Sequence, residues 1–187
     1  MPPEPPGWVK PVGILSIVFG SLGIIGSVCG LAVSGWMISP VWDDMMRQAA
    51  EASGDTYTPM PKPSIGSLMQ QAALFAWAIV LLVAGIQTLM RKPVARALHL
   101  IWAVGKVVLV IWGTWIGLQY SAQMTEWAEQ HGDPQATGMM GFGGVASTAT
   151  TVLMIIWQLA WPTFCLIWFG LVKTKPDDIT GGFEPAA

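Results

Sequence analysis

Long runs without a charged residue alternate with short charged segments along this chain of 187 residues. Each run is dominated by apolar side chains, and the runs cover residues 11–42, 63–90, 107–125 and 134–172. A helix needs about 20 mainly apolar residues to cross a bilayer core of roughly 30 Å. The pattern therefore predicts a transmembrane domain over residues 12–172. We place its four spans at residues 12–39, 67–90, 97–120 and 147–172.

The segments outside the spans are short and differ in composition. Residues 1–11 form a proline-rich leader, and residues 173–187 form a C-terminal tail. After the first span, Ser39 and Pro40 are typical of a helix start, and apolar residues then recur at helical spacing. The third span continues as a polar helical extension until Gly132. The sequence thus predicts an all-α, integral membrane four-helix bundle with short extracytoplasmic helical extensions.

Basic residues set the expected orientation of this bundle. Arg91, Lys92 and Arg96 lie in the short segment between the second and third spans, and other lysines flank the first and fourth spans. Basic loops are retained on the cytoplasmic side of a membrane. We therefore expect both termini in the cytoplasm and the two acidic loops outside.

Composition narrows the classes of function. Apolar residues make up 53% of the chain and charged residues 11%, whereas soluble domains hold roughly 25% charged residues. The formal net charge is −2 and no basic stripe is present, which argues against nucleic-acid binding. The expected partners are the lipid bilayer and either another membrane protein or a second copy of this chain.

Small residues follow one face of the first span at alternating steps of three and four. The set consists of Gly13, Ser16, Gly20, Gly23, Ser27, Gly30 and Ser34. In lipid, small residues let two helix backbones approach and gain van der Waals contact. A period of 3.5 residues favours a left-handed crossing of about +20°. We expect this small-residue stripe to pack on the third span, through Gly113 and Gly117, or on the first span of another protomer.

Lys106 is the one charged residue inside a predicted span. A lysine near the membrane centre costs roughly 2.5–3.5 kcal/mol and is by default a functional hypothesis. The structural alternative, which we favour, is that its ammonium group snorkels toward the cytoplasmic surface. His99 lies seven residues earlier on the same helical face, which we expect to look into the bundle. Contact with a lipid headgroup or bound anion, and a role in transport, remain the functional alternatives.

The fourth span carries a helix breaker beside a polar residue. Pro162 cannot donate a hydrogen bond to the carbonyl of Gln158, so we expect a kink at this point. Gln158 and the deep Trp161 surround it. Together with His99 and Lys106 they form a candidate polar or ligand site, which would hold a lipid tail, a quinone-like ring or a substrate. Ordinary packing around a proline kink is the favoured alternative.

Methionine is frequent in the outer half of the predicted bundle. Thioethers are soft ligands that select Cu(I), and the candidate copper ligands are Met45, Met46, Met139, Met140 and His131. Their spacing forms no specific ligand pattern, and flexible methionines also suit apolar loops at a bilayer. We therefore assign no metal and no cofactor.

No catalytic constellation is found. The chain lacks the G-x-S-x-G, H-E-x-x-H, Walker and C-x-x-C motifs, and its carboxylates are confined to loops and tails. Cys29 and Cys165 are predicted at different depths of the membrane, so we expect two free, buried thiols. The sequence favours a protein that is not an enzyme and has no catalytic residues.

The opening stretch PGWVKPVGILSIVFGSLGIIG resembles the start of small bacterial four-span inner-membrane proteins that have a proline-rich leader and a glycine-rich first span. The resemblance implies a bacterial inner-membrane location and nothing about activity. Our leading prediction is a non-catalytic accessory, assembly or membrane-organising component that acts through helix–helix packing. The alternative is a small transporter, channel or lipid- or hydrophobic-ligand-binding protein that uses Lys106 and Gln158. A membrane-embedded enzyme is the least favoured.

Overall fold

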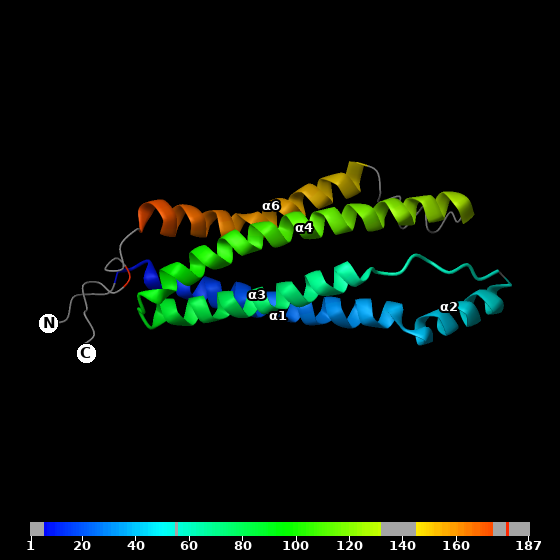
Figure 1. Ribbon diagram of the computed structural model, residues 1–187, viewed down its shortest axis with the longest axis horizontal. Helices are drawn as coiled ribbons and strands as arrows, with labels where there is room; N and C mark the ends of the chain where they lie inside the picture. Colours follow the sequence, from blue (N-terminus) through cyan, green and yellow to red (C-terminus); the bar gives the residue numbers. More distant parts are fainter. Residues whose placement is uncertain (1–5, 55, 132–144, 174–178, 180–187) are drawn as a thin grey trace.

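The computed structural model describes residues 6–54, 56–131, 145–173 and 179, and every regular element in these ranges is helical. The elements are α1 (Val9–Ile38), α2 (Pro40–Ser53), α3 (Ile65–Leu89), α4 (Val94–His131), α6 (Val145–Ile167) and the π-helix η1 (Trp168–Val172). The long helices α1, α3, α4 and α6 run along one common direction (Figure 1). We call the end at which α1 begins the η1 end, and the opposite end the α2 end.

Four helices in the described residues are long and apolar enough to cross a membrane, namely α1, α3, α4 and the segment Val152–Val172. The prediction of an all-α, four-helix membrane bundle is therefore confirmed. Helices α1, α3 and α4 begin two or three residues before the predicted spans, at Val9, Ile65 and Val94. The fold class follows from the charge-free runs, because only a helix satisfies every backbone polar group within one segment in lipid.

The predicted helix after the first span is confirmed as α2. The hydroxyl oxygen of Ser39 accepts a hydrogen bond from the amide of Trp42, and Pro40 occupies the first helical position. The helix ends at Gly54, whose φ of 78° suits a residue without a side chain. Helix α4 also extends as predicted, continuing beyond the third span to His131.

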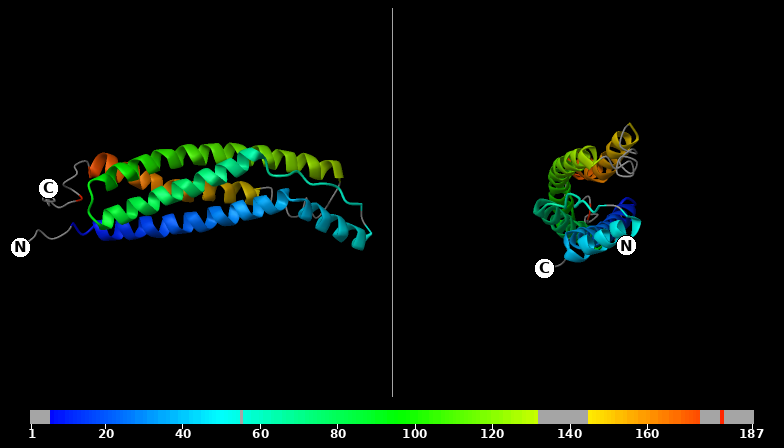
Figure 2. Two further views of the ribbon diagram at one scale, coloured as in Figure 1. Left: turned by 60° about the horizontal axis from the view of Figure 1, so that its bottom comes forward. Right: turned by 90° about the vertical axis from the view of Figure 1, so that its right-hand side faces the viewer.

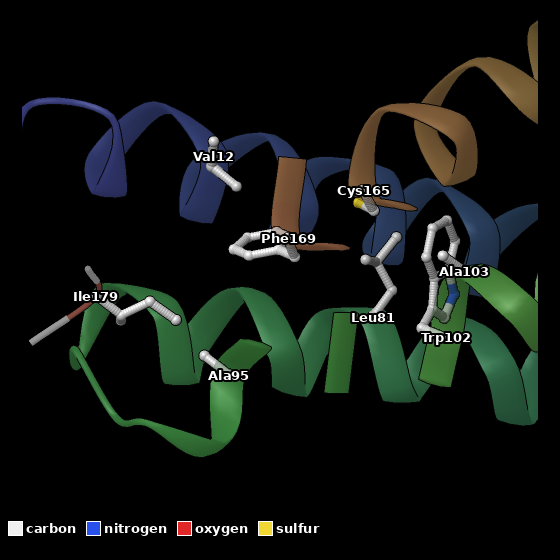
Figure 3. Close-up of a cluster of buried hydrophobic side chains, with 8 residues drawn as sticks. All are labelled: Val12, Leu81, Ala95, Trp102, Ala103, Cys165, Phe169 and Ile179. Atoms are coloured by element: carbon white, nitrogen blue, oxygen red, sulfur yellow. The ribbon is translucent and has the colours of Figure 1, made fainter. Parts of the chain in front are cut away.

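A cluster of buried apolar side chains lies toward the η1 end of the bundle. It joins Val12 of α1, Leu81 of α3, Trp102 of α4 and Phe169 of η1. In Figure 3 the ring of Phe169 lies in the middle of this group, and Ile179 lies at its edge. This core holds the helices together at the end where the N-terminal part of α4 meets η1.

The small-residue stripe of α1 packs mainly against α3, and not against Gly113 and Gly117 of the third span as expected, although Ser16 of the stripe bonds to His99 on α4. A Cβ at Gly20 would lie 2.8 Å from the backbone nitrogen of Leu82, and one at Gly23 would lie 3.0 Å from the Cβ of Ala78. Gly85 of α3 makes the approach reciprocal, because a Cβ there would lie 2.9 Å from the backbone of α1. Gly85, a small residue on α3, therefore allows that helix to approach the stripe closely.

Gly113 and Gly117, the two glycines of α4 that we expected to contact the small-residue stripe, do not pack against it. Gly113 lies against the side chain of Gln70 on α3, and no described atom lies within 4 Å of a Cβ at Gly117. The two glycines of α1 outside the stripe, Gly26 and Gly35, also have no described atom within 4 Å of a Cβ. Close approach along α1 is thus confined to one face.

The two cysteines are free, but their burial differs from expectation. Cys165 is buried in the η1-end core, whereas Cys29 is exposed on α1. Cys29 lies two residues beyond buried Ser27, on a part of α1 that no neighbouring helix covers. The prediction of two buried thiols was therefore wrong for Cys29.

The four long helices form a chain of neighbours in which α3 lies between α1 and α4, and α6 packs on α4. The end-on view in Figure 2 shows α4 and α6 together on one side of the bundle and α1 and α3 on the other. Aromatic side chains also link α6 to α1, with the ring centroids of Phe19 and Trp161 5.2 Å apart. Leu153 and Trp157 of α6 nevertheless stay mostly exposed, although the ring of Trp157 also meets that of Phe19 edge-on, with centroids 6.3 Å apart.

Candidate functional site

His99 links three elements inside the bundle. Its Nε2 lies 2.9 Å from the Ser16 hydroxyl oxygen on α1, and its Nδ1 lies 2.8 Å from the carbonyl oxygen of Ala95. A carbonyl only accepts, so Nδ1 carries the hydrogen and Nε2 accepts from the hydroxyl. The fully buried ring also packs on Phe169, with centroids 4.6 Å apart. Both ring nitrogens are thus engaged in holding α4 to its neighbours.

Lys106 and Gln158 meet across two helices. The ammonium nitrogen of Lys106 donates to the side-chain oxygen of Gln158 at 3.3 Å, which joins α4 to α6. Pro162 is buried one turn further along α6. The structure therefore brings together two residues of the predicted polar site, while His99 bonds to a different helix.

Trp161 packs among aromatic side chains. Its indole stacks on Phe164, with ring centroids 4.9 Å apart, and it also contacts Phe19. Its buried N–H has no hydrogen-bond partner among the described residues. The predicted polar site is therefore divided into a histidine junction, a lysine–glutamine pair and an aromatic cluster.

A cavity at the α2 end brings together polar residues that sequence reasoning missed. It has a volume of about 350 Å³ and lies between α1, α3, α4 and the segment before α3. Seven of its lining residues carry an amide or a hydroxyl group and come from all of these elements: Ser34, Ser64, Ser67, Gln70, Gln119, Tyr120 and Gln123. We call this cavity the amide cleft. The pair Gln70–Gln71 within the charge-free second span was the sequence signal that could have indicated it.

Two features of the chain create the amide cleft. Gly113 and Gly117 present no side chains, and the space beside Gly117 is empty of described atoms within 4 Å. The extended segment of residues 56–64 forms another wall. Tyr120 donates a hydrogen bond to the carbonyl of Pro61, at 3.3 Å, and Trp127 donates to that of Pro59, at 2.9 Å. These bonds fix the wall to α4.

An ion pair ties α2 to the same segment. The Lys62 ammonium contacts one carboxylate oxygen of Asp43, and the hydroxyl of Tyr57 donates to the other at 3.1 Å. The hydrogen bond from Lys62 is the main cause that lowers the pKa of Asp43. Burial is the main cause that raises the pKa of Tyr57. Both groups therefore keep their ordinary charge states at neutral pH, and the positive charge of Lys62 is balanced beside the cleft.

The described residues include no group of three or more His, Cys, Asp or Glu side chains that could hold a metal ion. Of the candidate copper ligands, Met45 and Met46 lie on α2, while Met139 and Met140 lie outside the described residues. His131 stacks on Trp127, with ring centroids 5.1 Å apart, and its Nδ1 lies 2.7 Å from the carbonyl oxygen of that residue.

Comparisons with known proteins give no family. No family description, no curated protein and no solved structure matches the chain.

Proposed function

We propose that the protein is a non-catalytic membrane component that acts through association of its helices, as an accessory, assembly or membrane-organising protein. The charge pattern and the resemblance of the first span support a bacterial inner-membrane location with both termini in the cytoplasm. The α2 end then faces outward. The partner is a second membrane protein or another copy of this chain.

The observation that supports this proposal is that polar groups within the spans form hydrogen bonds from one helix to another. Ser16 with His99, and Lys106 with Gln158, form bonds between different helices. The indole of Trp77 likewise donates from α3 to a backbone carbonyl of α4. A nucleophile or general base needs a reactive atom within reach of a substrate. Groups committed to interhelical bonds instead stabilise the bundle, which favours a structural role.

Helix α6 is the preferred contact surface for a partner. The small-residue stripe of α1 is already occupied by α3. The apolar stretch of α6 with η1 is the least enclosed of the four spans, and its Leu153 and Trp157 side chains are 65% and 68% exposed. We therefore place the partner on this face.

Photo-cross-linking in native membranes tests this proposal. A photoreactive residue replaces Leu153 of α6 in one variant and Leu22 of α1, which is also exposed, in a matched control. We expect a discrete protein adduct of one fixed mass at position 153 and only lipid adducts at position 22. Lipid adducts alone at both positions, and at Ile111 on α4, would contradict association through the helices.

Binding of a small ligand is the second candidate function, and the amide cleft favours it. Its volume of about 350 Å³ lies within the range of roughly 300–1,000 Å³ found for small-molecule sites. Its polar groups come from separate elements and converge on one space, as specific binding requires.

A further inference from the structure

We propose that the amide cleft binds an uncharged, hydroxyl-rich group of the size of a hexose, carried by a membrane lipid or free in solution. This inference goes beyond helix association and rests only on the cleft. It would stand even if no partner protein contacted α6.

The hydrogen-bonding capacity of the lining identifies the ligand chemistry. Each of Gln70, Gln119 and Gln123 offers two N–H donors and an acceptor oxygen, and Ser34 offers a hydroxyl group. None of these four side chains has a hydrogen-bond partner among the described residues. A ligand that both donates and accepts satisfies such a mixture, and a sugar hydroxyl does both.

The uncharged lining of the cleft argues against a phosphate, carboxylate or quaternary ammonium group as the ligand. Among the residues that the structure describes, no lysine, arginine, histidine, aspartate or glutamate lines the cleft. The nearest base along the wall segment, Lys62, is paired with Asp43. A phosphate or carboxylate would therefore lack a cationic partner. Of the aromatic rings in the described lining, a quaternary ammonium group would meet that of Tyr120 alone, whereas a cage for such a cation uses several aromatic rings.

The position of the cleft suits a group at the membrane surface. Ser34 and Met37 lie in the last turns of α1, directly before the capped start of α2. Gln119 and Gln123 lie on the facing helix, where the predicted third span ends. Met37 and Ile116 add apolar surface to the lining. A sugar ring presents C–H faces beside its hydroxyl groups, so this mixed surface matches it.

Gly117 provides the perturbation for a test. A Cβ there meets no described atom within 4 Å, so Gly117→Leu places a side chain at the cleft without a clash at its Cβ. Gly26 of α1 also has no described atom within 4 Å of a Cβ and does not line the cleft. Gly26→Leu is therefore a matched control for inserting a leucine into a helix. Gln123→Met is a second variant, because it removes one amide at an exposed position and keeps the length of the side chain.

Binding is measured with the full-length protein in two arms. In the first, nanodiscs contain either monoglucosyl diacylglycerol or phosphatidylglycerol in a neutral lipid, and native mass spectrometry counts the retained lipid. In the second, methyl glucoside is titrated by calorimetry in a detergent without a sugar headgroup, since a maltoside would compete. Binding in the first arm alone assigns the sugar to a lipid. Binding in the second identifies a soluble source.

The expected result is preferential retention of the glucosyl lipid over phosphatidylglycerol, binding of methyl glucoside, or both. Gly117→Leu should weaken the observed binding by about tenfold or more, Gln123→Met should weaken it to a lesser degree, and Gly26→Leu should leave it unchanged. The proposal is overturned if neither probe binds, if phosphatidylglycerol is retained equally, or if all three variants bind like the wild type.

Discussion

The contact between α1 and α3 makes Gly20→Ala the sharpest test of the packing. A Cβ at this position would lie 2.8 Å from the nitrogen of Leu82 and 3.0 Å from its Cα, and backbone atoms cannot rotate away as a side chain can. Ordinary van der Waals contact begins at 3.4 Å, so the two helices must separate by roughly 0.6 Å. A gap of 0.5–1 Å forfeits about a quarter to a half of the dispersion energy of the atoms involved.

The expected loss of stability is about 1–3 kcal/mol, the usual cost of overpacking a close contact. Gly26→Ala is the control, because a Cβ there meets no described atom within 4 Å. Both variants gain the same intrinsic helix propensity, about 0.8–1 kcal/mol on scales measured in water. The difference between them therefore isolates the contact with α3.

Unfolding in mixed micelles, with an increasing fraction of dodecyl sulfate and tryptophan fluorescence as the signal, gives the free energy of unfolding of each variant. We expect Gly20→Ala to unfold at a lower dodecyl sulfate fraction than Gly26→Ala. Equal midpoints for the two variants would refute close backbone packing at Gly20. A similar comparison of Gly23→Leu with Ile24→Leu extends the test along α1, since only the glycine lies on the small-residue stripe.

Three further predictions concern polar contacts. Ser16→Ala should lower the free energy of unfolding by about 1–3 kcal/mol, because it leaves a buried imidazole nitrogen without a partner; an unchanged unfolding midpoint would contradict this. A double-mutant cycle with Lys106→Met and Gln158→Leu should give a coupling energy of about 0.6 kcal/mol, as for other interhelical bonds in membranes, whereas additive effects would show that the pair does not interact. A carbon NMR titration of Asp43 should give a pKa below 3.8 that rises in Lys62→Met. Since the folded-state pKa is lowered, the contact of α2 with the wall segment stabilises the fold above pH 3.8 and weakens as the pH falls through the lowered value; the same pKa in both proteins would rule out this contact.

Much of the secondary structure was predictable because it depends on neighbouring residues. The charge-free runs indicated four spans, and the pair Ser39–Pro40 indicated the start of α2. The π-helix η1 was missed. It places Phe169 against His99 and lets the carbonyl of Phe169 accept a hydrogen bond from Arg96. No local pattern distinguishes such a segment from the end of an ordinary α-helix.

The candidate site was predicted only in part. Lys106 and Gln158 were singled out separately, because a polar group within a span is conspicuous, and the structure brings them within hydrogen-bonding distance. The amide cleft was not predicted, although Gln70 and Gln119 are visible in the sequence. Its existence depends on where α4 passes α3, and on the lack of a side chain at Gly117.

The sequence by itself determined the helical architecture, because in a bilayer each backbone must satisfy its own hydrogen bonds and only long apolar helices do so within one segment. It also determined that α1 carries one face able to approach another backbone closely. Only the tertiary structure decided that α3 takes that face, since Gly85 supplies the matching gap. The tertiary structure alone decided that amides from α3 and α4 converge on one cavity. Helix–helix contacts in lipid depend on the fit of two surfaces, and the sequence of a single helix specifies only one of them.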